Sequence, residues 1–141
     1  MRYMLDTDTC SYLIKQSPLS VLKSMDKTTQ HGHEIIISSI TYAELMLGAK
    51  RVSESAYKNR LLHKIHELCE RLHEICSWDK QAADQYSDLQ TDLLNNGTPI
   101  GANDTLIAAH ALSVQATLVT NNTKHFSKVP DIKLENWVEK R

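Results

Sequence analysis

Three acidic residues, Asp6, Glu44 and Asp104, lie far apart in the sequence and have the chemistry needed to hold a cation. Carboxylate oxygens are hard ligands that suit Mg²⁺ or Mn²⁺, and no thiolate pair or histidine cluster of recognised spacing accompanies them. Such a ligand set supports hydrolysis of a phosphodiester, because the cation lowers the pKa of a bound water and stabilises charge on the phosphate. The three acids therefore predict a hydrolytic metal site if the fold brings them together.

Asp104 lies at the start of a predicted helix. Gly101 can break regular structure, and Asn103 can act as the N-cap of the helix. Ile107 and His110 then follow at helical spacing. This places Asp104 in the first turn, where the helix dipole favours a carboxylate. Taken alone, Asp104 is also explained as an acid that only complements this dipole.

Asp6 directly follows the apolar run at residues 3–5, which predicts a short buried strand. In open parallel sheets, ligands bind beyond the carboxyl ends of the strands, so Asp6 lies where chemistry is expected. The alternative is that Asp6 only caps the helix that follows. Asp8 and Thr9 could provide that cap equally well.

Glu44 lies on a predicted helix over residues 40–48, which Ser38 and Ser39 precede as caps. Ile40, Ala43 and Leu47 share one face of this helix, and Glu44 borders that face. An acid beside an apolar stripe needs a partner. A salt bridge is one interpretation, and metal ligation or general-base work is the other.

Strands alternate with helices along the whole chain. Extended segments are predicted at residues 3–5, 34–38, 75–78, 116–120 and 132–134. Helices are predicted around residues 12–14, 17–25, 40–48, 53–75, 80–94 and 104–111. This order predicts an α/β fold with a mainly parallel central sheet flanked by helices. Asp6 and Asn122 follow strands, whereas Glu44 and Asp104 lie near helix starts, so all four are expected to meet at one edge of the sheet.

The 141 residues fit a single domain over 1–141, with 41% hydrophobic and 23% charged residues and no internal repeat. The sequence shows no signal peptide and no run of eighteen apolar residues, so we expect a cytoplasmic protein without a membrane partner. Three cysteines without a CxxC pair predict reduced thiols. The net charge of −1 does not indicate a nucleic-acid binder, but acids gathered around a cation would lower it. The scattered Lys and Arg residues are interpreted as solvated helix faces.

The long helix predicted over residues 53–75 has the length of an arm that packs on the sheet or on a second subunit. Three histidines and a cysteine within it, His63, His66, Cys69 and His73, raise the possibility of zinc. No second ligand pair with recognised spacing follows, so we interpret these residues as solvated.

Four motifs in order resemble those of PIN-domain ribonucleases. They are LDT at residues 5–7, SITYAEL at 39–45, GANDTLIAAHA at 101–111 and VTNN at 119–122. More narrowly, the chain is similar to the VapC toxins of bacterial type II toxin–antitoxin modules, down to IKLENW at residues 132–137. The resemblance implies a PIN fold and magnesium-dependent endoribonuclease activity, with Mn²⁺ as a substitute.

The resemblance also implies partners. It implies a VapB-type antitoxin, a homodimer, and a higher-order complex of the toxin with its antitoxin. For VapC toxins that end in a segment like IKLENW, the resemblance implies that the RNA substrate is initiator tRNA, cleaved in the anticodon loop region.

Residue by residue, Asp6, Glu44 and Asp104 match the first three acids of the family. Asn122 falls on the fourth catalytic position, where many relatives carry Asp, and His125 stands where close relatives often have Glu or Asp. Both departures leave the pocket less anionic and weaken the hold on a second metal ion. Thr120 matches a supporting position of the family, where a hydroxyl could orient a carboxylate.

In the expected mechanism, Asp6 and Asp104 are the principal metal ligands, and Glu44 positions or deprotonates the attacking water. Two other classes of function use similar residues. A non-catalytic RNA-binding or adaptor PIN domain should lack one of the first three acids, and this sequence keeps all three. A small metallophosphatase would differ in substrate, which a comparison of nuclease and phosphatase assays would reveal.

Overall fold

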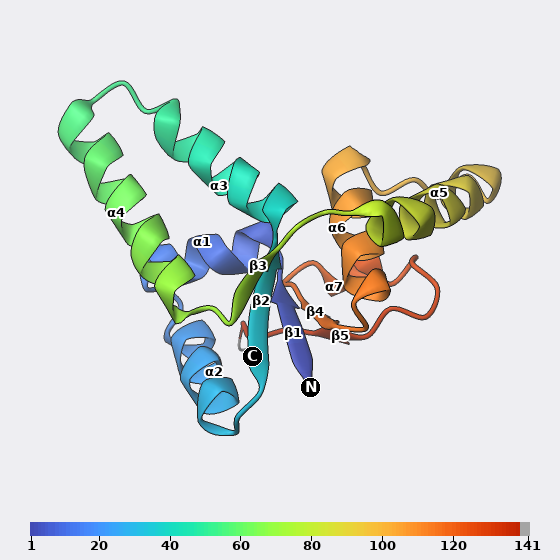
Figure 1. Ribbon diagram of the computed structural model, residues 1–141, viewed down its shortest axis with the longest axis horizontal. Coiled ribbons are helices and arrows are strands. Elements are labelled where there is room, and N and C mark those ends of the chain that lie inside the picture. The colour runs from blue at the N-terminus through green and yellow to red at the C-terminus, as the bar shows by residue number, and fades with distance from the viewer. Residues whose placement is uncertain (139–141) are drawn as a thin grey trace.

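Parallel strands form the centre of the protein. A computed structural model describes residues 1–138, and its strands are β1 (Arg2–Leu5), β2 (Glu34–Ser38), β3 (Glu74–Cys76), β4 (Thr117–Val119) and β5 (Leu134–Glu135). They pair in the order β3-β2-β1-β4-β5, and every pairing is parallel (Figure 1). The prediction of an α/β fold with a parallel central sheet is confirmed.

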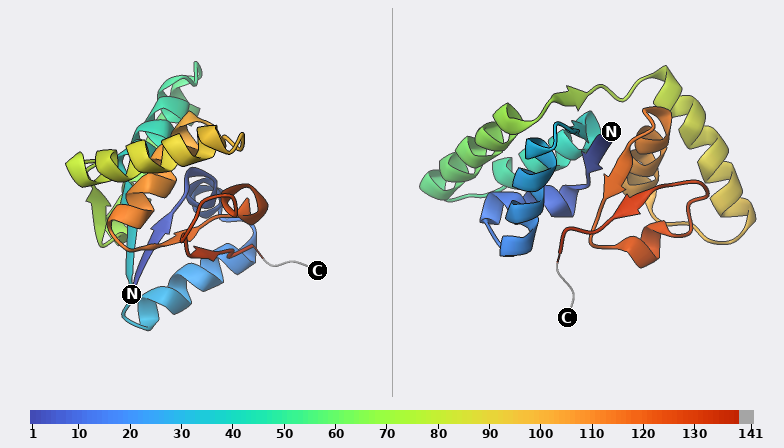
Figure 2. Two further views of the ribbon diagram at one scale, coloured as in Figure 1. Left: turned by 90° about the vertical axis from the view of Figure 1, so that its right-hand side faces the viewer. Right: turned by 90° about the horizontal axis from the view of Figure 1, so that it is seen from below.

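Helices cover both faces of the sheet. Within the described range they are α1 (Thr7–Lys15), α2 (Leu19–Gln30), α3 (Ser39–Lys50), α4 (Ser55–Arg71), α5 (Lys80–Asn95), α6 (Ala102–Ser113) and α7 (Thr123–Phe126). The views in Figures 1 and 2 agree that α1 to α4 lie on one side of the strands and α5 to α7 on the other. Helices α3 and α4 project together away from the sheet, and we call residues 39–71 the α3–α4 arm.

Alternate residues of the inner strands face opposite layers. Met4 and Leu118 belong to the core cluster formed with α5 and α6, whereas Leu5 and Val119 belong to the cluster formed with α1, α2 and α4. All four side chains are fully buried. Because both faces of the sheet are covered, the strands read as continuous apolar runs rather than as alternating patterns.

The register of the strands brings distant parts of the chain to one edge of the sheet. Leu5 at the end of β1 pairs with Val119 at the end of β4. The next residue, Asp6, donates its backbone N–H to the Val119 carbonyl at 3.0 Å. Helix α3 starts at Ser39, directly after β2, with Ser38 as its N-cap. This edge therefore receives the residues that follow β1, β2 and β4.

Helix α4 ends at Arg71, which corrects the prediction of one helix over residues 53–75. Leu72 is already extended, and Ile75 lies in β3, where it pairs with Ile37 of β2. Leu72 and Ile75 continue the helical spacing of apolar residues, but strand pairing takes the backbone groups of residues 74–76. The sequence shows the spacing and cannot show this long-range pairing.

Helix α3 buries a different face from the one predicted. Its buried residues are Thr41, Leu45 and Ala49, whereas Ala43 is exposed and Leu47 is 59% exposed. Apolar residues occur almost all around this helix, so their spacing does not select one side. The polar residue Thr41 therefore escaped the prediction of the core.

No helix among residues 1–138 is long and apolar enough to cross a membrane. Cys10, Cys69 and Cys76 are free thiols, in agreement with the prediction from their number and spacing. Burial raises the pKa of all three, that of Cys76 to about 11. The thiols are therefore protonated at neutral pH and act as small apolar groups.

Shortening a buried side chain of β4 should test the packing of the sheet against α5 and α6. Leu118→Ala in β4 empties a fully buried site and should lower the free energy of unfolding by about 2–5 kcal/mol. Leu94→Ala is the matched control, because Leu94 is 58% exposed and its loss should cost less than about 0.5 kcal/mol. Urea unfolding followed by circular dichroism measures both; equal costs would contradict the described core.

Candidate active site

Asp6 lies between β1 and α1. Its Oδ1 accepts the backbone N–H of Thr9 at 2.8 Å, so Asp6 itself is the N-cap, and the suggestion that Asp8 or Thr9 provides the cap is wrong. The Asp6 carboxylate is also hydrogen-bonded by the hydroxyl of Thr120. Only 6% of the residue is exposed, and this burial raises its pKa against the opposing effect of the hydrogen bonds.

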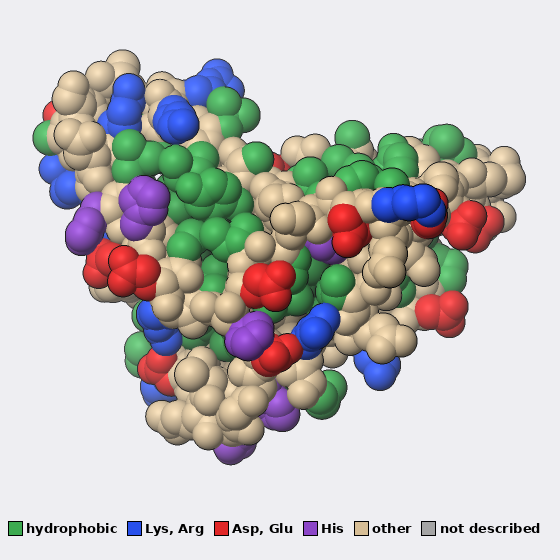
Figure 3. All heavy atoms as spheres, viewed as in Figure 1, with side chains coloured by type: hydrophobic (Ala, Val, Ile, Leu, Met, Phe, Trp, Pro, Cys, Tyr) green, Lys and Arg blue, Asp and Glu red, His purple; other side chains and the backbone are tan. Residues whose placement is uncertain are grey.

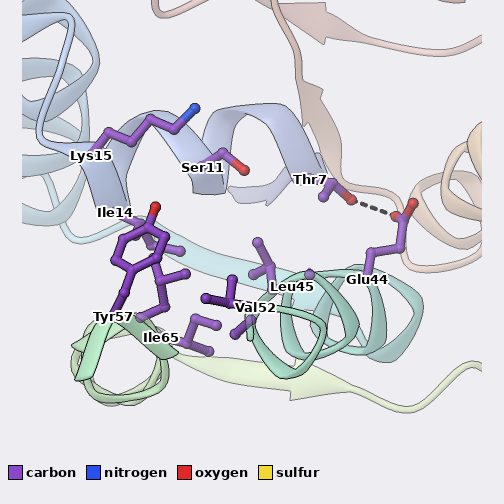
Figure 4. Close-up of a pocket in the computed structure, with 12 residues that line it drawn as sticks. Thr7, Ser11, Ile14, Lys15, Glu44, Leu45, Val52, Tyr57 and Ile65 are labelled. Atoms are coloured by element: carbon purple, nitrogen blue, oxygen red, sulfur yellow. Dashed lines mark hydrogen bonds between the residues drawn. The ribbon is translucent and has the colours of Figure 1, made fainter. Parts of the chain in front are cut away.

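Glu44 is held by two donors from different helices. The Thr7 hydroxyl of α1 donates to Oε1 at 2.5 Å (Figure 4), and the Asn103 side-chain amide of α6 donates to Oε2 at 2.9 Å. No Lys, Arg or His of residues 1–138 forms an ion pair with Glu44, so the salt-bridge interpretation is not supported. Each carboxylate oxygen thus has a neutral donor, and the negative charge is not balanced by a side-chain cation.

Asp104 lies in the first turn of α6, as predicted. The helix is capped by Gly101 rather than by Asn103, which corrects that part of the prediction. Gly101 has a φ of 100°, a conformation that glycine adopts readily and other residues rarely do. Asn103 therefore falls inside the first turn, where its side chain is available for Glu44.

His125 contacts Asp104 from helix α7. Its Nε2 lies 3.1 Å from Asp104 Oδ2 and 2.6 Å from the backbone carbonyl of Ile100. Both neighbours are acceptors, so Nε2 carries a hydrogen and donates. Partial burial raises the pKa of Asp104, His125 lowers it, and the charge of Glu44 raises it again.

Thr120 and Asn122 lie at the end of β4. Thr120 is fully buried, and its hydroxyl accepts the backbone N–H of Asn122 at 2.9 Å. The backbone carbonyl of Asn122 in turn accepts the backbone N–H groups of His125 and Phe126. These hydrogen bonds form the first turn of α7. Thr120 therefore contacts the Asp6 carboxylate, a contact that fits what the resemblance implies for this residue, whereas Asn122 is exposed and contacts His125 through the backbone.

The acids influence one another electrostatically. Glu44 raises the pKa of Asp104, and Asp8 raises the pKa of both Asp6 and Asp104. Among residues 1–138, however, no group of three or more His, Cys, Asp or Glu side chains is arranged to hold a metal ion. Asp6, Glu44 and Asp104 share one edge of the sheet, each with hydrogen-bonding partners of its own. Their joint role as metal ligands stays a prediction.

Three neighbouring residues were missed as members of this region. Thr7 and Asn103 hold Glu44, and Asp8 adds charge beside Asp6 and Asp104. Thr7 directly follows Asp6, and Asn103 directly precedes Asp104. The signals in the sequence are that Thr7 and Asn103 adjoin predicted acids within the quoted motifs and that Asp8 lies two residues from Asp6.

A groove of about 400 Å³ runs from this region between α1, α3 and α4. Thr7 and Glu44 line one end of the groove, and Lys15 and Tyr57 line the other (Figure 4). The walls between them are mostly apolar. The candidate site is therefore continuous with the α3–α4 arm.

Comparison with known proteins shows a match of residues 3–132 to the family model described as PIN domain. The chain is 42% identical over 137 residues to a protein of Rickettsia felis named ribonuclease VapC2, covering 97% of this chain and 98% of that protein. It is 36% identical to a tRNA(fMet)-specific endonuclease VapC of Salmonella typhimurium, with the same coverage.

Solved structures agree with these sequence matches. The crystal structure of VapBC2 from Rickettsia felis, bound to a DNA fragment from its promoter, contains a chain that superposes with a TM-score of 0.89. That chain is 38% identical, and the superposition covers 98% of the present chain and all of the other.

The raised pKa of Asp6 predicts how stability depends on pH. Because the folded pKa lies above the ordinary value of 3.8, the cost of burying the charge is absent at lower pH and develops as pH rises through the folded pKa. In EDTA, the free energy of unfolding of the natural protein should therefore fall relative to that of Asp6→Asn as pH rises from about 3.5 to 7. Asp92→Asn, on an exposed part of α5, is the control. A difference that moves the other way would contradict the assignment.

Proposed function

The chain belongs to the PIN-domain family and, within it, to the VapC ribonucleases, and on this basis we propose that its toxic activity is Mg²⁺-dependent hydrolysis of RNA at Asp6, Glu44 and Asp104. One observation supports the assignment most directly. The two donors to Glu44 are Thr7 and Asn103, which adjoin Asp6 and Asp104 in the sequence. Glu44 thereby couples the positions of the other two acids.

The residues present fit a hard divalent cation. Asp6, Glu44 and Asp104 supply only carboxylate oxygens, the ligands that Mg²⁺ prefers, and Mn²⁺ is the expected substitute. The charge of Glu44 raises the pKa of Asp104, a repulsion that a bound cation would relieve. In the proposal Asp6 and Asp104 are the principal ligands. When bound, the ion supplies Lewis acidity and neutralises the pocket toward phosphate.

The side chains of this protein have distinct tasks in the proposed reaction. Glu44 orients the attacking water and accepts its proton, and Thr7 and Asn103 fix the carboxylate in position for this. Thr120 orients Asp6 through its hydroxyl. Asn122 is the fourth site residue, and the oxygen of its side-chain amide is a neutral ligand.

Partners and substrate follow from the relatives. The chain is proposed to be the toxin of a type II module, inhibited by a VapB-type antitoxin whose basic side chain, expected to be Arg, enters the acidic pocket. We propose a homodimer that assembles further with the antitoxin, and initiator tRNA, cleaved in its anticodon loop region, as the substrate. The proposed compartment is the cytoplasm, where free thiols stay reduced.

Removing one acid should stop the reaction without unfolding the protein. Asp104→Asn should lower cleavage of initiator tRNA at least about 100-fold, because a ligand charge is lost while the shape is kept. Stability should not fall, since crowded carboxylates repel one another. Asp84→Asn, whose exposed side chain pairs with Lys80, is the matched control and should cleave normally. Undiminished cleavage by a folded Asp104→Asn variant would contradict the assignment of Asp104 to the site.

Asn122 and His125, which depart from the family pattern, should affect the Mg²⁺ concentration that cleavage requires. His125→Asp removes the donor to Asp104 and adds a charge, and Asn122→Asp adds a charge at the end of β4. Both should lower the Mg²⁺ concentration for half-maximal cleavage, His125→Asp more strongly because His125 contacts Asp104 directly.

The measurement is a magnesium titration of the cleavage rate at fixed RNA concentration and ionic strength. His125→Gln keeps a side-chain N–H donor without adding charge, and Asn96→Asp adds a charge at the exposed end of α5. Neither control should shift the midpoint as His125→Asp does. Coincident curves for all variants would show that residues 122 and 125 do not act on the metal.

A further inference from the structure

Basic residues concentrate at the free end of the α3–α4 arm. Residues 50–64 contain five Lys or Arg and one acid, Glu54, whereas the rest of the chain holds 11 basic and 16 acidic residues. We call the basic residues, together with Tyr57, the arm tip: Lys50, Arg51, Tyr57, Lys58, Arg60 and Lys64. Figure 3 shows Lys and Arg side chains over this end of the molecule. A chain with a net charge of −1 thus carries a local positive surface.

Ion pairing does not account for these charges. None of the five basic side chains forms a salt bridge with an acid of residues 1–138. The one acid within residues 50–64, Glu54, uses both carboxylate oxygens to cap α4, accepting from the N–H groups of Ala56 at 3.0 Å and Tyr57 at 2.6 Å. The positive charges are therefore available to an outside partner.

Helix stability explains only part of the pattern. Lys50 lies in the last turn of α3, where a cation complements the helix dipole. Lys58 lies in the first turn of α4, where the dipole disfavours it by about 0.3–1 kcal/mol. Arg60 and Lys64 lie farther along α4 and gain nothing from either helix end. The helix dipole therefore does not account for Lys58, Arg60 or Lys64.

The arm tip also offers an aromatic ring. Tyr57 is 47% exposed, and the Arg60 guanidinium lies 5.7 Å from its ring centroid. Tyr57, Arg60 and Lys64 share one face of α4, because they are spaced by three and four residues. A partly exposed tyrosine among cations is a platform on which a base can stack while the cations contact phosphates.

The arm tip is connected to the candidate site. Glu44 and Lys50 belong to the same helix, six residues apart, which is about 9 Å along the axis. The groove that begins at Thr7 and Glu44 ends at Lys15 and Tyr57 (Figure 4). An RNA strand with its scissile phosphate beside the acids can therefore reach the arm tip within a few nucleotides.

We propose that the arm tip binds RNA phosphates outside the cleaved segment and stacks one base on Tyr57. This inference rests on the proposed ribonuclease function. The acids of the site repel phosphate, and the arm tip supplies attraction at a distance from them. RNA fits this surface better than an acidic protein segment, because the cations are accompanied by a partly exposed ring that pairs with Arg60.

The test compares two sets of four charge removals. The arm variant carries Lys50→Gln, Arg51→Gln, Lys58→Gln and Arg60→Gln. The control carries the same number of changes at exposed lysines elsewhere, Lys23→Gln, Lys27→Gln, Lys128→Gln and Lys133→Gln. Circular dichroism melting confirms that both sets are folded. Each set is made in the natural chain for cleavage and with Asp104→Asn for binding.

Binding of an initiator tRNA transcript is measured over a range of KCl concentrations. The arm variant should bind at least about tenfold more weakly near 0.1 M salt, and its slope of log Kd against log salt should fall by about 2–4. The control should change neither quantity by as much. Equal binding by the arm variant and the control overturns the proposal. So does an arm variant that loses only its binding to a co-purified antitoxin, since the surface would then be a protein interface.

Cleavage separates the arm from the catalytic residues. For the full tRNA the arm variant should raise KM at least about tenfold with kcat unchanged. For a dinucleotide that carries only the scissile phosphate, which is too small to reach the arm tip, kcat/KM should not change. Tyr57→Leu should weaken tRNA binding about fivefold or more, and Tyr57→Phe should not. If the natural chain binds the tRNA but cleaves no RNA, the proposed function fails while the binding series still decides the role of the arm.

Discussion

The position of the Glu44 carboxylate is the constraint on which the candidate site depends. Its two oxygens accept from Thr7 at 2.5 Å and from Asn103 at 2.9 Å, so one side chain of α3 connects α1 with α6. These helices pack on opposite faces of the sheet, and Glu44 accepts hydrogen bonds from both at its carboxyl edge. Because parallel pairing sets β1, β2 and β4 level at this edge, the sheet register determines whether Glu44 can reach both donors.

Electrostatic repulsion shapes the rest of the site. Burial and neighbouring acids raise the pKa of Asp6 and Asp104, and the structure offsets this only with hydroxyl and amide donors and the imidazole of His125. No Lys or Arg among the described residues pairs with Asp6, Glu44 or Asp104. The neighbouring strong cations, Lys15 and the basic residues of the α3–α4 arm, form no ion pair with these acids, and Lys15 lines the far end of the groove. This separation leaves the negative charge of the acids and the positive charge of the arm on different parts of the surface, as the proposed metal site and the proposed RNA contact both require.

The sequence predicted the elements better than the contacts between them. Buried strands such as β2 are recognisable because β-branched residues follow one another, and the glycine, the cap candidate and the apolar spacing around Asp104 predict its place in a first helical turn. The end of α4 was not predictable, since apolar spacing continues to Ile75 while pairing with β2 decides the structure. Asn103 resembles a cap in the sequence, but the positive φ of Gly101 moves the start of α6 two residues earlier. Thr7 and Asn103 gain their role only from tertiary contact with Glu44.

The pairing of β1 with β4 joins residues that are more than one hundred positions apart, as the hydrogen bond from the Thr9 hydroxyl to the Val119 carbonyl illustrates. Thr120, whose hydroxyl is hydrogen-bonded to the Asp6 carboxylate, directly follows β4. A nascent chain therefore cannot complete the candidate site until residue 120 has been synthesised, however early its first helices form. At about 5–20 residues per second, most of translation passes before the site can assemble. The order of synthesis thus delays activity in the same cell that must make the toxin.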